Sequence, residues 1–382
     1  LLPEYWVGLM SRSNTAHRTS AGLQYLAFCD RKTSAYIRGA YDSTTDSLEL
    51  HTAKNETQLR HFAKQHGQPL GDFIPEWEVY FDPHNTVRID YKNKTINRFQ
   101  PTSYMLDTTS TKPPKVIPKV INKLIDHATG SDPKVAKHFI NWLATIIQNR
   151  DRTRTAWVLH GTQGTGKGLL TANVLRPLFG RHLTNKRIDE FDEKFNTYIE
   201  DCLVVCVDEV QTKTLKNERG VIAKLKNFIT EEFVSVRAMH ANAVEVRNYT
   251  NWIFMSNMSD AVSIDRNDRR FNVATYQPNK LVITSQEVDS IPSQLQAFYN
   301  YLVNYPADIK LAGTILDTAD RDTMVSLSEA SIDTVGRAIL EGNFGFFIEH
   351  LPTDKSHLRN PLITNKVEDY KDLLKELIAR TN

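Results

Sequence analysis

The sequence predicts an α/β fold, with a parallel sheet flanked by helices, from three observations. Segments 203–207 and 251–255 are nearly continuous apolar runs, as in strands that are buried on both faces. Segment 156–160 is a third run of this kind, and a glycine-rich turn follows it directly. Helical patterns separate these runs, and strands that alternate with helices pair in parallel. We expect a mixed α+β region before this core and a helical region after it.

The composition is that of a globular protein. The chain has 382 residues, of which 40% are hydrophobic and 24% are charged, and its net charge is +2. This balance excludes a disordered, collagen-like or membrane-embedded chain, and any basic surface must be local. Three cysteines cannot build a disulfide framework, so a reducing, cytoplasmic compartment is expected.

Residues 1–112 are predicted to form a mixed α+β accessory or linker domain. Apolar and turn-forming residues predict strands at 34–41, 77–81 and 87–91 and a short helix at 59–65. The acidic residues of this region do not form the paired carboxylates of a polymerase metal site. We therefore expect no polymerase or primase centre here.

The rest of the chain follows a proline-rich boundary at 112–118. Ser131 or Asp132 can cap a helix that begins at Pro133 and carries one apolar face. Three segments are predicted: a helical segment at 113–154, the α/β core at 155–280, and a helical region at 281–382 that ends in a charged amphipathic helix at 367–380.

The strongest functional signal is a phosphate-binding loop between a predicted strand and an amphipathic helix. Gly161 to Gly168 match the pattern G-x-x-x-x-G-K. Glycines let backbone N–H groups wrap a phosphate chain, while the helix N-terminus and the lysine add positive potential. A plain strand-to-helix turn is the alternative. The predicted nucleotide-binding residues are Gly161, Thr162, Gln163, Gly164, Thr165, Gly166, Lys167, Gly168 and Leu169.

One position departs from the usual pattern of such loops. Gly168 stands where a Ser or Thr normally ligates Mg²⁺. The metal would then be held through water, through Thr171, or by acidic residues elsewhere. Nucleotide binding is therefore better supported than fast hydrolysis.

Polar residues end the two buried runs that follow. Asp208 can hold Mg²⁺ through its water shell, and Glu209 can polarise an attacking water as a general base. Asn257 can contact the outer phosphate or position that water. The alternatives are a solvated acidic turn and a turn-forming asparagine.

Two arginines follow in the segment 268–271. An arginine near a neighbour's triphosphate can stabilise transition-state charge across a subunit interface. We favour Arg269 over Arg270 for this role. A surface salt-bridge cluster is the alternative.

Segment 213–247 is locally basic, with seven Lys and Arg against four Glu. Alternating residues predict a hairpin of strands 233–237 and 244–247. Such a hairpin can follow a nucleic-acid backbone through phosphate contacts, although a solvated hairpin without a partner gives the same pattern. The predicted DNA-binding residues are Lys224, Lys226, Arg237 and His240.

The order of these motifs resembles that of superfamily 3 helicases, which are viral and plasmid replication motors of the AAA+ class. Their compact core corresponds to 161–257, and the resemblance covers about 115–305. A narrower likeness is to the C-terminal motor of phage and plasmid primase-helicases, some of which carry Gly-Lys-Gly in this loop. The chain does not begin with Met, so we expect a piece of a phage replicative polypeptide that also carries a primase or polymerase.

The resemblance implies a hexameric ring that binds single-stranded DNA in its channel, with ATP and Mg²⁺ at sites between subunits. Hydrolysis would drive unwinding in the host cytoplasm. The subunit that owns a site would supply Lys167, Asp208, Glu209 and Asn257, and its neighbour would supply the arginine. The hairpin tip around His240 would line the channel.

Two other functions stay open. A poorly hydrolysing ring, assembled by nucleotide, could hold DNA for a polymerase or primase on the same polypeptide, and Gly168 favours this reading. A nucleoside monophosphate kinase also uses a Gly-Lys-Gly loop. Such kinases do not usually place an Asp-Glu pair and a polar Asn after the following strands.

Overall fold

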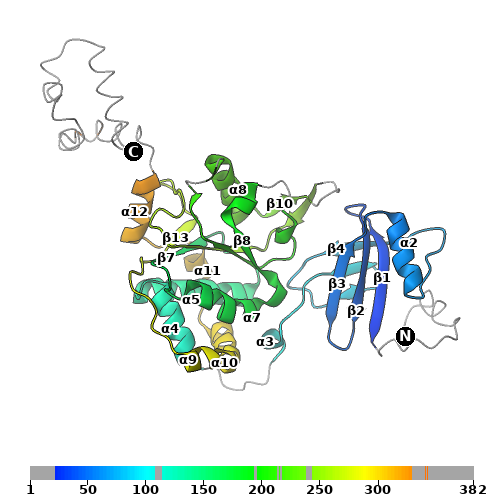
Figure 1. Cartoon of the computed structure of the whole chain (residues 1–382), viewed down its shortest axis with the longest axis horizontal. Helices are drawn as coiled ribbons and strands as arrows, with labels where there is room; N and C mark the ends of the chain where they lie inside the picture. The colour runs from blue at the N-terminus through cyan, green and yellow to red at the C-terminus, as the bar shows by residue number, and fades with distance from the viewer. Residues whose placement is uncertain are drawn as a thin grey trace, which may run out of the picture.

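The structure is a computed structural model of the chain. It describes residues 22–107, 114–192, 196–212, 215, 217–237, 243–328, 340 and 342. Figure 1 shows a small sheet domain, coloured blue to cyan, beside a larger α/β body that contains the rest of the described chain. The mixed α/β architecture with a parallel sheet is as predicted.

The N-terminal domain is a six-stranded sheet with one helix on it. The strand order is β3-β2-β1-β4-β6-β5, in which β1 to β3 are antiparallel and β4 joins β1 in parallel. It has a hydrophobic core of its own, built around Phe28 and Trp77. The elements are β1 (Leu23–Asp30), β2 (Tyr36–Asp42), β3 (Ser47–Thr52), α2 (Glu56–Gln65), β4 (Glu76–Tyr80), β5 (Ile89–Asp90) and β6 (Thr95–Asn97).

The predicted strand at 87–91 is shorter than expected. The carboxylate of Asp90 accepts hydrogen bonds from the backbone N–H groups of Lys92 and Asn93, at 2.9 and 3.0 Å. Lys94 adopts a positive φ of 53°. These contacts turn the chain immediately after Asp90, so that β5 has two residues and pairs with β6 as a hairpin.

The larger body is built on a five-stranded parallel sheet of order β13-β7-β12-β9-β8. Because β12 pairs with both β7 and β9, its end lies between theirs. The strands are β7 (Ala156–His160), β8 (Leu183–Arg187), β9 (Val204–Asp208), β12 (Asn251–Ser256) and β13 (Phe271–Val273).

Helices cover both faces of this sheet (Figure 1). Side chains such as Trp157 and Ile253 pack with α4, α5 and α10 on one face, whereas Trp252 and Phe254 pack with α8 on the other. Alternate residues therefore serve opposite cores, which explains the continuous apolar runs. The helices are α3 (Ser103–Leu106), α4 (Lys119–Ala128), α5 (Pro133–Asn149), α8 (Glu218–Thr230), α9 (Ser285–Asp289), α10 (Ile291–Asn304), α11 (Ile309–Ala312) and α12 (Ala319–Ser328).

The helix after the glycine-rich turn is interrupted, whereas the sequence predicts one continuous helix. It consists of α6 (Lys167–Leu170), a π-helical turn at Thr171–Leu175 and α7 (Arg176–Phe179). The N–H of Arg176 donates to the carbonyl of Thr171, and Pro177 has no N–H to continue the regular ladder. The helix ends at Gly180.

The helical nature of the C-terminal region agrees with α9 to α12, as far as residue 328. The amphipathic helix predicted at 367–380 lies outside the described residues. None of the described helices is both long and apolar enough to cross a membrane.

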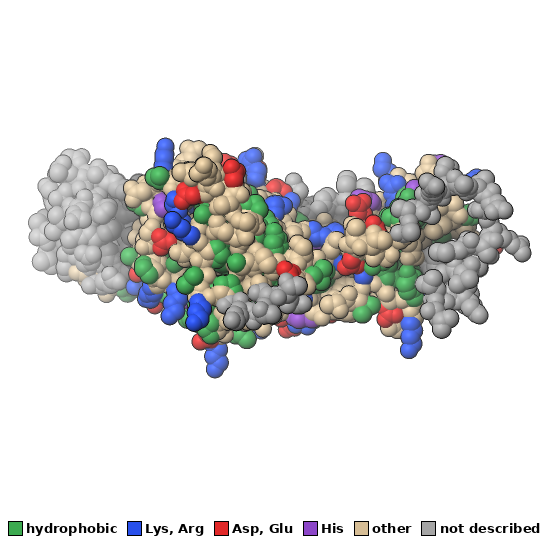
Figure 2. All heavy atoms as spheres, turned by 90° about the horizontal axis from the view of Figure 1, so that it is seen from below, with side chains coloured by type: hydrophobic (Ala, Val, Ile, Leu, Met, Phe, Trp, Pro, Cys, Tyr) green, Lys and Arg blue, Asp and Glu red, His purple; other side chains and the backbone are tan. Residues whose placement is uncertain are grey.

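The small domain and the larger body are joined by polar contacts and by aromatic packing of Phe81 against His182 and Tyr249. Seen from below in Figure 2, Lys and Arg side chains are interspersed with acidic ones over both, rather than gathered in one patch. The polar pairs include Arg98 Nη1 with Glu200 Oε2 at 2.5 Å, Arg150 Nη1 with the Pro83 carbonyl at 3.0 Å, and Arg181 Nη1 with the Leu48 carbonyl at 2.8 Å.

Candidate nucleotide-binding site

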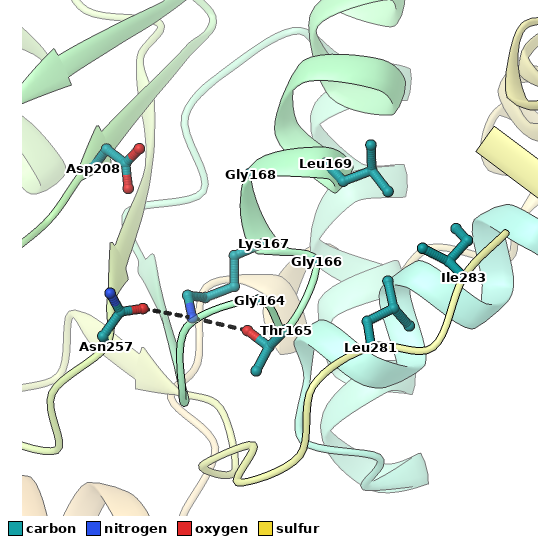
Figure 3. Close-up of a pocket in the computed structure, with 10 residues that line it drawn as sticks. All are labelled: Gly164, Thr165, Gly166, Lys167, Gly168, Leu169, Asp208, Asn257, Leu281 and Ile283. Carbon is teal, nitrogen blue, oxygen red and sulfur yellow. Dashed lines mark hydrogen bonds between the residues drawn. The ribbon is translucent and has the colours of Figure 1, made fainter. Parts of the chain in front are cut away.

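A pocket of about 360 Å³ opens at the carboxyl edge of the five-stranded sheet, where β9 and β12 end beside the glycine-rich loop (Figure 3). Polar groups gather at the strand ends, and leucine and isoleucine side chains form the opposite wall. The lining residues are Gly164, Thr165, Gly166, Lys167, Gly168, Leu169, Asp208, Asn257, Leu281 and Ile283.

A segment that sequence reasoning missed lies across the loop, and we call it the strap (277–283). The N–H of Thr162 donates to the Gln277 carbonyl at 2.8 Å, and the N–H of Leu281 donates to the Gly164 carbonyl at 2.9 Å. At Gly161, φ is 154° and a Cβ would lie 2.5 Å from the Gln277 carbonyl oxygen. Glycine is therefore required there by the strap as well as by the loop.

The other side of the loop is fastened to α4. His127 Nδ1 lies 3.0 Å from the Thr165 carbonyl oxygen, so its N–H donates to the loop. At Gly166, φ is 85° and a Cβ would lie 2.7 Å from Leu281 Cδ2. The loop is thus held from two sides by its own chain, in a conformation that leaves Lys167 facing the pocket.

Lys167 lies at the centre of the polar end and is 8% exposed. Its Nζ donates to Thr165 Oγ1 at 2.9 Å and to the Gly161 carbonyl at 3.0 Å. Asn257 Oδ1 accepts from the same ammonium at 3.3 Å, as Figure 3 shows. Burial lowers the pKa of Lys167, and the nearby Asp208 carboxylate opposes that shift. An anion in this pocket would meet a cation that is little screened by water.

The two residues of the acidic pair are placed differently. Both are exposed, but Asp208 ends β9 and lines the pocket, whereas Glu209 is not part of the lining. The Asp208 carboxylate accepts a hydrogen bond from the Glu209 N–H at 2.9 Å. Glu209 has a φ of 51°, a left-handed conformation that is costly for a residue with a Cβ. The backbone strain therefore falls at the turn that presents the carboxylates.

The residues present can accept Mg²⁺ through one carboxylate. Gly168 lines the pocket, and a Cβ added there would meet nothing within 4 Å. Thr171, the alternative considered from the sequence, is 2% exposed and donates to the Lys167 carbonyl at 3.1 Å. Its hydroxyl is therefore turned into the fold and is not available as a ligand. Asp208 is left as the candidate protein ligand. One carboxylate suffices, because Mg²⁺ usually keeps waters and phosphate oxygens as its other ligands.

Arg269 and Arg270 lie at the other edge of the sheet. The Arg270 carbonyl accepts from the N–H of Ala156, the first residue of β7, at 2.7 Å. The phosphate loop follows the last residue of β7, so roughly 16 Å of strand separates the arginines from the pocket of the same chain, at about 3.3 Å per residue. Arg269 is exposed, whereas Arg270 Nη1 pairs with Asp268 Oδ2 at 3.3 Å.

The predicted hairpin is present as β10 (Phe233–Val236) and β11 (Val244–Arg247), which pair antiparallel. Arg237 is exposed at the end of β10, and His240 lies outside the described residues. The two lysines of α8 make contacts within the chain. Lys224 Nζ donates to the Phe191 carbonyl at 3.0 Å, and Lys226 forms ion pairs with Asp265 and Asp268.

Residues 159–270 match the family DUF5906, a family of unknown function. Over 320 residues the chain is 30% identical to the DNA primase-polymerase of Nitratiruptor phage NrS-1, an alignment that covers 79% of this chain and 44% of that protein. The chain therefore spans less than half the length of the curated relative that it matches.

The structural comparison agrees. The apo structure of the NrS-1 C-terminal region matches with a TM-score of 0.71 and 25% identity, over 94% of this chain and 84% of that chain. The active helicase Cch of SCCmec type IV matches more weakly, with a TM-score of 0.35 and 12% identity over 97% of this chain and 71% of that chain. The chain is homologous to the C-terminal region of the NrS-1 phage primase-polymerase. This confirms the resemblance to a phage replication protein, whereas helicase activity stays a prediction.

Proposed function

We propose that the chain is a nucleotide-driven motor of DNA replication, with an AAA+ core of the superfamily 3 helicase type. It would form a ring around single-stranded DNA and couple ATP hydrolysis to translocation and unwinding. The observation that carries the proposal is the meeting of Lys167, Asn257 and Asp208 around one pocket beside a phosphate-binding loop. Homology to a phage primase-polymerase supports the replicative setting.

Each part of the pocket has a task in nucleotide hydrolysis. The triphosphate would lie against the N–H groups of the loop, with Lys167 on its outer phosphates. Mg²⁺ held by Asp208 through water would neutralise part of the phosphate charge. Glu209 would accept the proton of the attacking water, and Asn257 would orient that water. The turn at Glu209 would bring its side chain into the pocket when nucleotide binds.

The apolar wall is suited to a nucleobase. Leu169, Leu281 and Ile283 line the pocket on the side away from Asp208 (Figure 3). Apolar side chains hold the faces of a base, while the polar end holds the phosphates. The strap would therefore contact the base at the same time as it fixes the loop.

The position of the arginines supports the proposed ring. Arg269 is exposed at the amino edge of the sheet, one strand length away from the pocket of its own chain. An arginine that acts on a triphosphate from there has to act on the pocket of another subunit. A ring of identical subunits brings each amino edge to a neighbour's carboxyl edge.

Gly168 favours a second candidate, a ring that binds nucleotide but hydrolyses it poorly. The hydroxyl that normally follows the loop lysine and ligates the metal is then missing, because Gly168 has no side chain and Thr171 is bonded into the fold. In this reading, nucleotide holds the subunits together around DNA for a polymerase on the same polypeptide.

The test is ATP turnover by the purified chain with and without single-stranded DNA, with Lys167→Ala as the blank. Turnover that rises with DNA is expected of the motor. Tight ATP binding without turnover, once the ring has formed, would replace the motor by the second candidate. Phosphoryl transfer to a nucleoside monophosphate would instead identify a kinase, and absence of ATP binding would overturn all three.

A further inference from the structure

A network of ion pairs holds the segment 264–270, which we call the arginine loop. At its centre is Asp268, whose side chain is 1% exposed. Its Oδ1 accepts from the backbone N–H of Arg270 at 2.8 Å, and its Oδ2 lies 3.3 Å from both Arg270 Nη1 and Lys226 Nζ. A buried carboxylate needs such partners, because removing its charge from water is costly. The shape of the arginine loop thus depends on these two cations.

Lys226 comes from a different part of the chain. It lies in α8, and its side chain is 17% exposed. Its ammonium also pairs with Asp265, the second residue of the arginine loop. One lysine of α8 is therefore shared by two carboxylates of this loop, and it is held there rather than extended into solvent.

The end of α8 is in turn fastened to the base of the hairpin. Asn248, which follows β11, is fully buried and its Nδ2 donates to the carbonyls of Phe228 and Glu231, at 2.7 and 3.0 Å. Its backbone N–H donates to the Glu232 carbonyl at 2.9 Å. Since β10 begins directly after Glu232, α8 and the hairpin form one connected unit.

The arginine loop is fixed to the body on another side. Arg321 of α12 is 5% exposed, and its Nη2 donates to the Asp268 carbonyl at 2.5 Å. Asp268 is thus held by the body through its carbonyl and by α8 through its carboxylate. Arg269, the next residue, is left exposed.

We propose that Lys226 is a positioning residue that couples the nucleotide at a subunit interface to the hairpin. A nucleotide that engages Arg269 would displace Asp268, and the ion pair would carry the displacement through α8 to the hairpin. The inference rests on the proposed function, because it takes Arg269 as the group that meets a neighbour's nucleotide. Lys226 then acts inside the chain, and not by the DNA contact that its charge alone predicts.

The test measures how much nucleotide binding changes DNA affinity. Fluorescence anisotropy gives the Kd of the full chain for a labelled single strand, with and without a non-hydrolysable ATP analogue, and the ratio of the two values is the coupling factor. Coupling between sites is typically 5- to 150-fold. In Lys226→Gln we expect the factor to fall to within about twofold of unity, while the Kd without nucleotide changes less than about twofold.

Two matched variants separate positioning from charge. Lys226→Arg keeps a cation that reaches Asp268, so it should retain the coupling factor. Lys224→Gln removes the same charge from the same helix but leaves the arginine loop untouched, so it should also retain the factor.

Four results would overturn the inference. Weaker DNA binding without nucleotide, at an unchanged coupling factor, would make Lys226 a DNA contact. An unchanged Lys226→Gln would remove the role altogether, as would equal losses in the Lys224 variant. A wild-type chain whose nucleotide and DNA sites are not coupled would also exclude it. Absent ATP turnover with an intact coupling factor would refute the motor and leave this inference standing.

Discussion

The two edges of the five-stranded sheet are organised in different ways. At the carboxyl edge, the loop 161–168 is shaped by backbone hydrogen bonds and by glycines that let the strap approach. At the amino edge, the arginine loop is shaped by side chains, with Asp268 bonded by Lys226 of α8 and Arg321 of α12. Both arrangements bring together segments that are distant in the sequence, the first mainly through backbone contacts and the second through side chains.

The difference matters for how each edge responds to change. Any residue whose side chain fits can make the backbone hydrogen bonds of the loop. The carboxyl edge should therefore be sensitive to substitution mainly at its glycines and at Lys167. Side-chain ion pairs fail when one partner is removed, since the other charge stays buried without compensation. We therefore expect substitutions at the carboxyl edge to affect the nucleotide, and those at the amino edge to affect communication between sites.

The largest effect is expected at the carboxyl edge, in Lys167→Ala. The loss of the cation facing the pocket should abolish ATP turnover and weaken ATP binding, because no other lysine or arginine lines this pocket among the described residues. Steady-state turnover and ATP titration would measure both. Lys280→Ala is the matched control, since it removes an exposed lysine of the strap from outside the pocket lining. Turnover retained in the Lys167 variant would disprove the site.

The counterpart at the amino edge is Arg269→Ala. An arginine supplied to a neighbour's triphosphate is worth about 10³-fold or more in turnover, while nucleotide affinity should stay within about twofold. Arg270→Ala should instead lower the melting temperature, because it leaves the Asp268 carboxylate with one partner fewer. If the Arg270 variant shows the selective loss of turnover, Arg269 is not the arginine that acts.

Mixing two inactive variants tests whether the edges meet across an interface. Lys167→Ala subunits retain Arg269, and Arg269→Ala subunits retain an intact pocket. If the arginine acts on a neighbour, equimolar mixing should restore part of the turnover, whereas each variant alone stays inactive. Failure of the mixture, with mixed rings verified by pull-down, would place the arginine's action within one chain or exclude it.

A smaller effect is expected from Gly168→Ser. A Cβ at this position meets nothing within 4 Å, so the hydroxyl can be placed at the pocket without disturbing the loop. If metal ligation limits turnover, the change should raise Mg²⁺-dependent turnover about tenfold, equivalent to 1.4 kcal/mol in the barrier. Turnover as a function of Mg²⁺ concentration would measure this, with Gly168→Ala as the control without a hydroxyl. An unchanged serine variant would show that the glycine is tolerated.

The two sheet edges also differ in how much of each could be predicted from the sequence. Lys167, Asp208 and Asn257 each end or follow an apolar run, and parallel pairing brings such ends to one edge, so their meeting was predictable from the pattern. Their roles stay predictions. The strap could not be foreseen, because nothing local in Gln277 or Leu281 indicates that it crosses the loop.

The amino edge was foreseen least. Lys226 resembles any cation of a basic segment, and only the fold brings it to Asp265 and Asp268. Pro177 was a visible signal for the interrupted helix, since a proline removes one bond of the ladder. Nothing in the sequence indicated that the Arg321 side chain would bond the Asp268 carbonyl.

The smallest expected effect concerns two buried histidines, one at each edge. His160 ends β7 and His182 precedes β8, and they are 1% and 0% exposed. Burial lowers the pKa of both. The unfolded chain, with histidine pKa values near 6.5, then binds more protons than the folded chain below that pH. The free energy of unfolding should therefore fall as pH decreases from about 6.5 toward the folded pKa values, by at most about 1.4 kcal/mol per pH unit for each histidine.

Urea unfolding at pH 7.5 and 5.5 would measure this loss. His182 Nε2 accepts from the Gln100 N–H at 2.9 Å and lies 3.1 Å from the Gln100 carbonyl oxygen, and its Nδ1 lies 2.7 Å from the Asp201 carbonyl oxygen. Protonation would therefore exchange the bond from the Gln100 N–H for one to the Gln100 carbonyl, at the joint with the small domain. His182→Gln should reduce the pH dependence. A wild-type stability that is equal at both pH values would show that folding does not change the pKa values of these histidines.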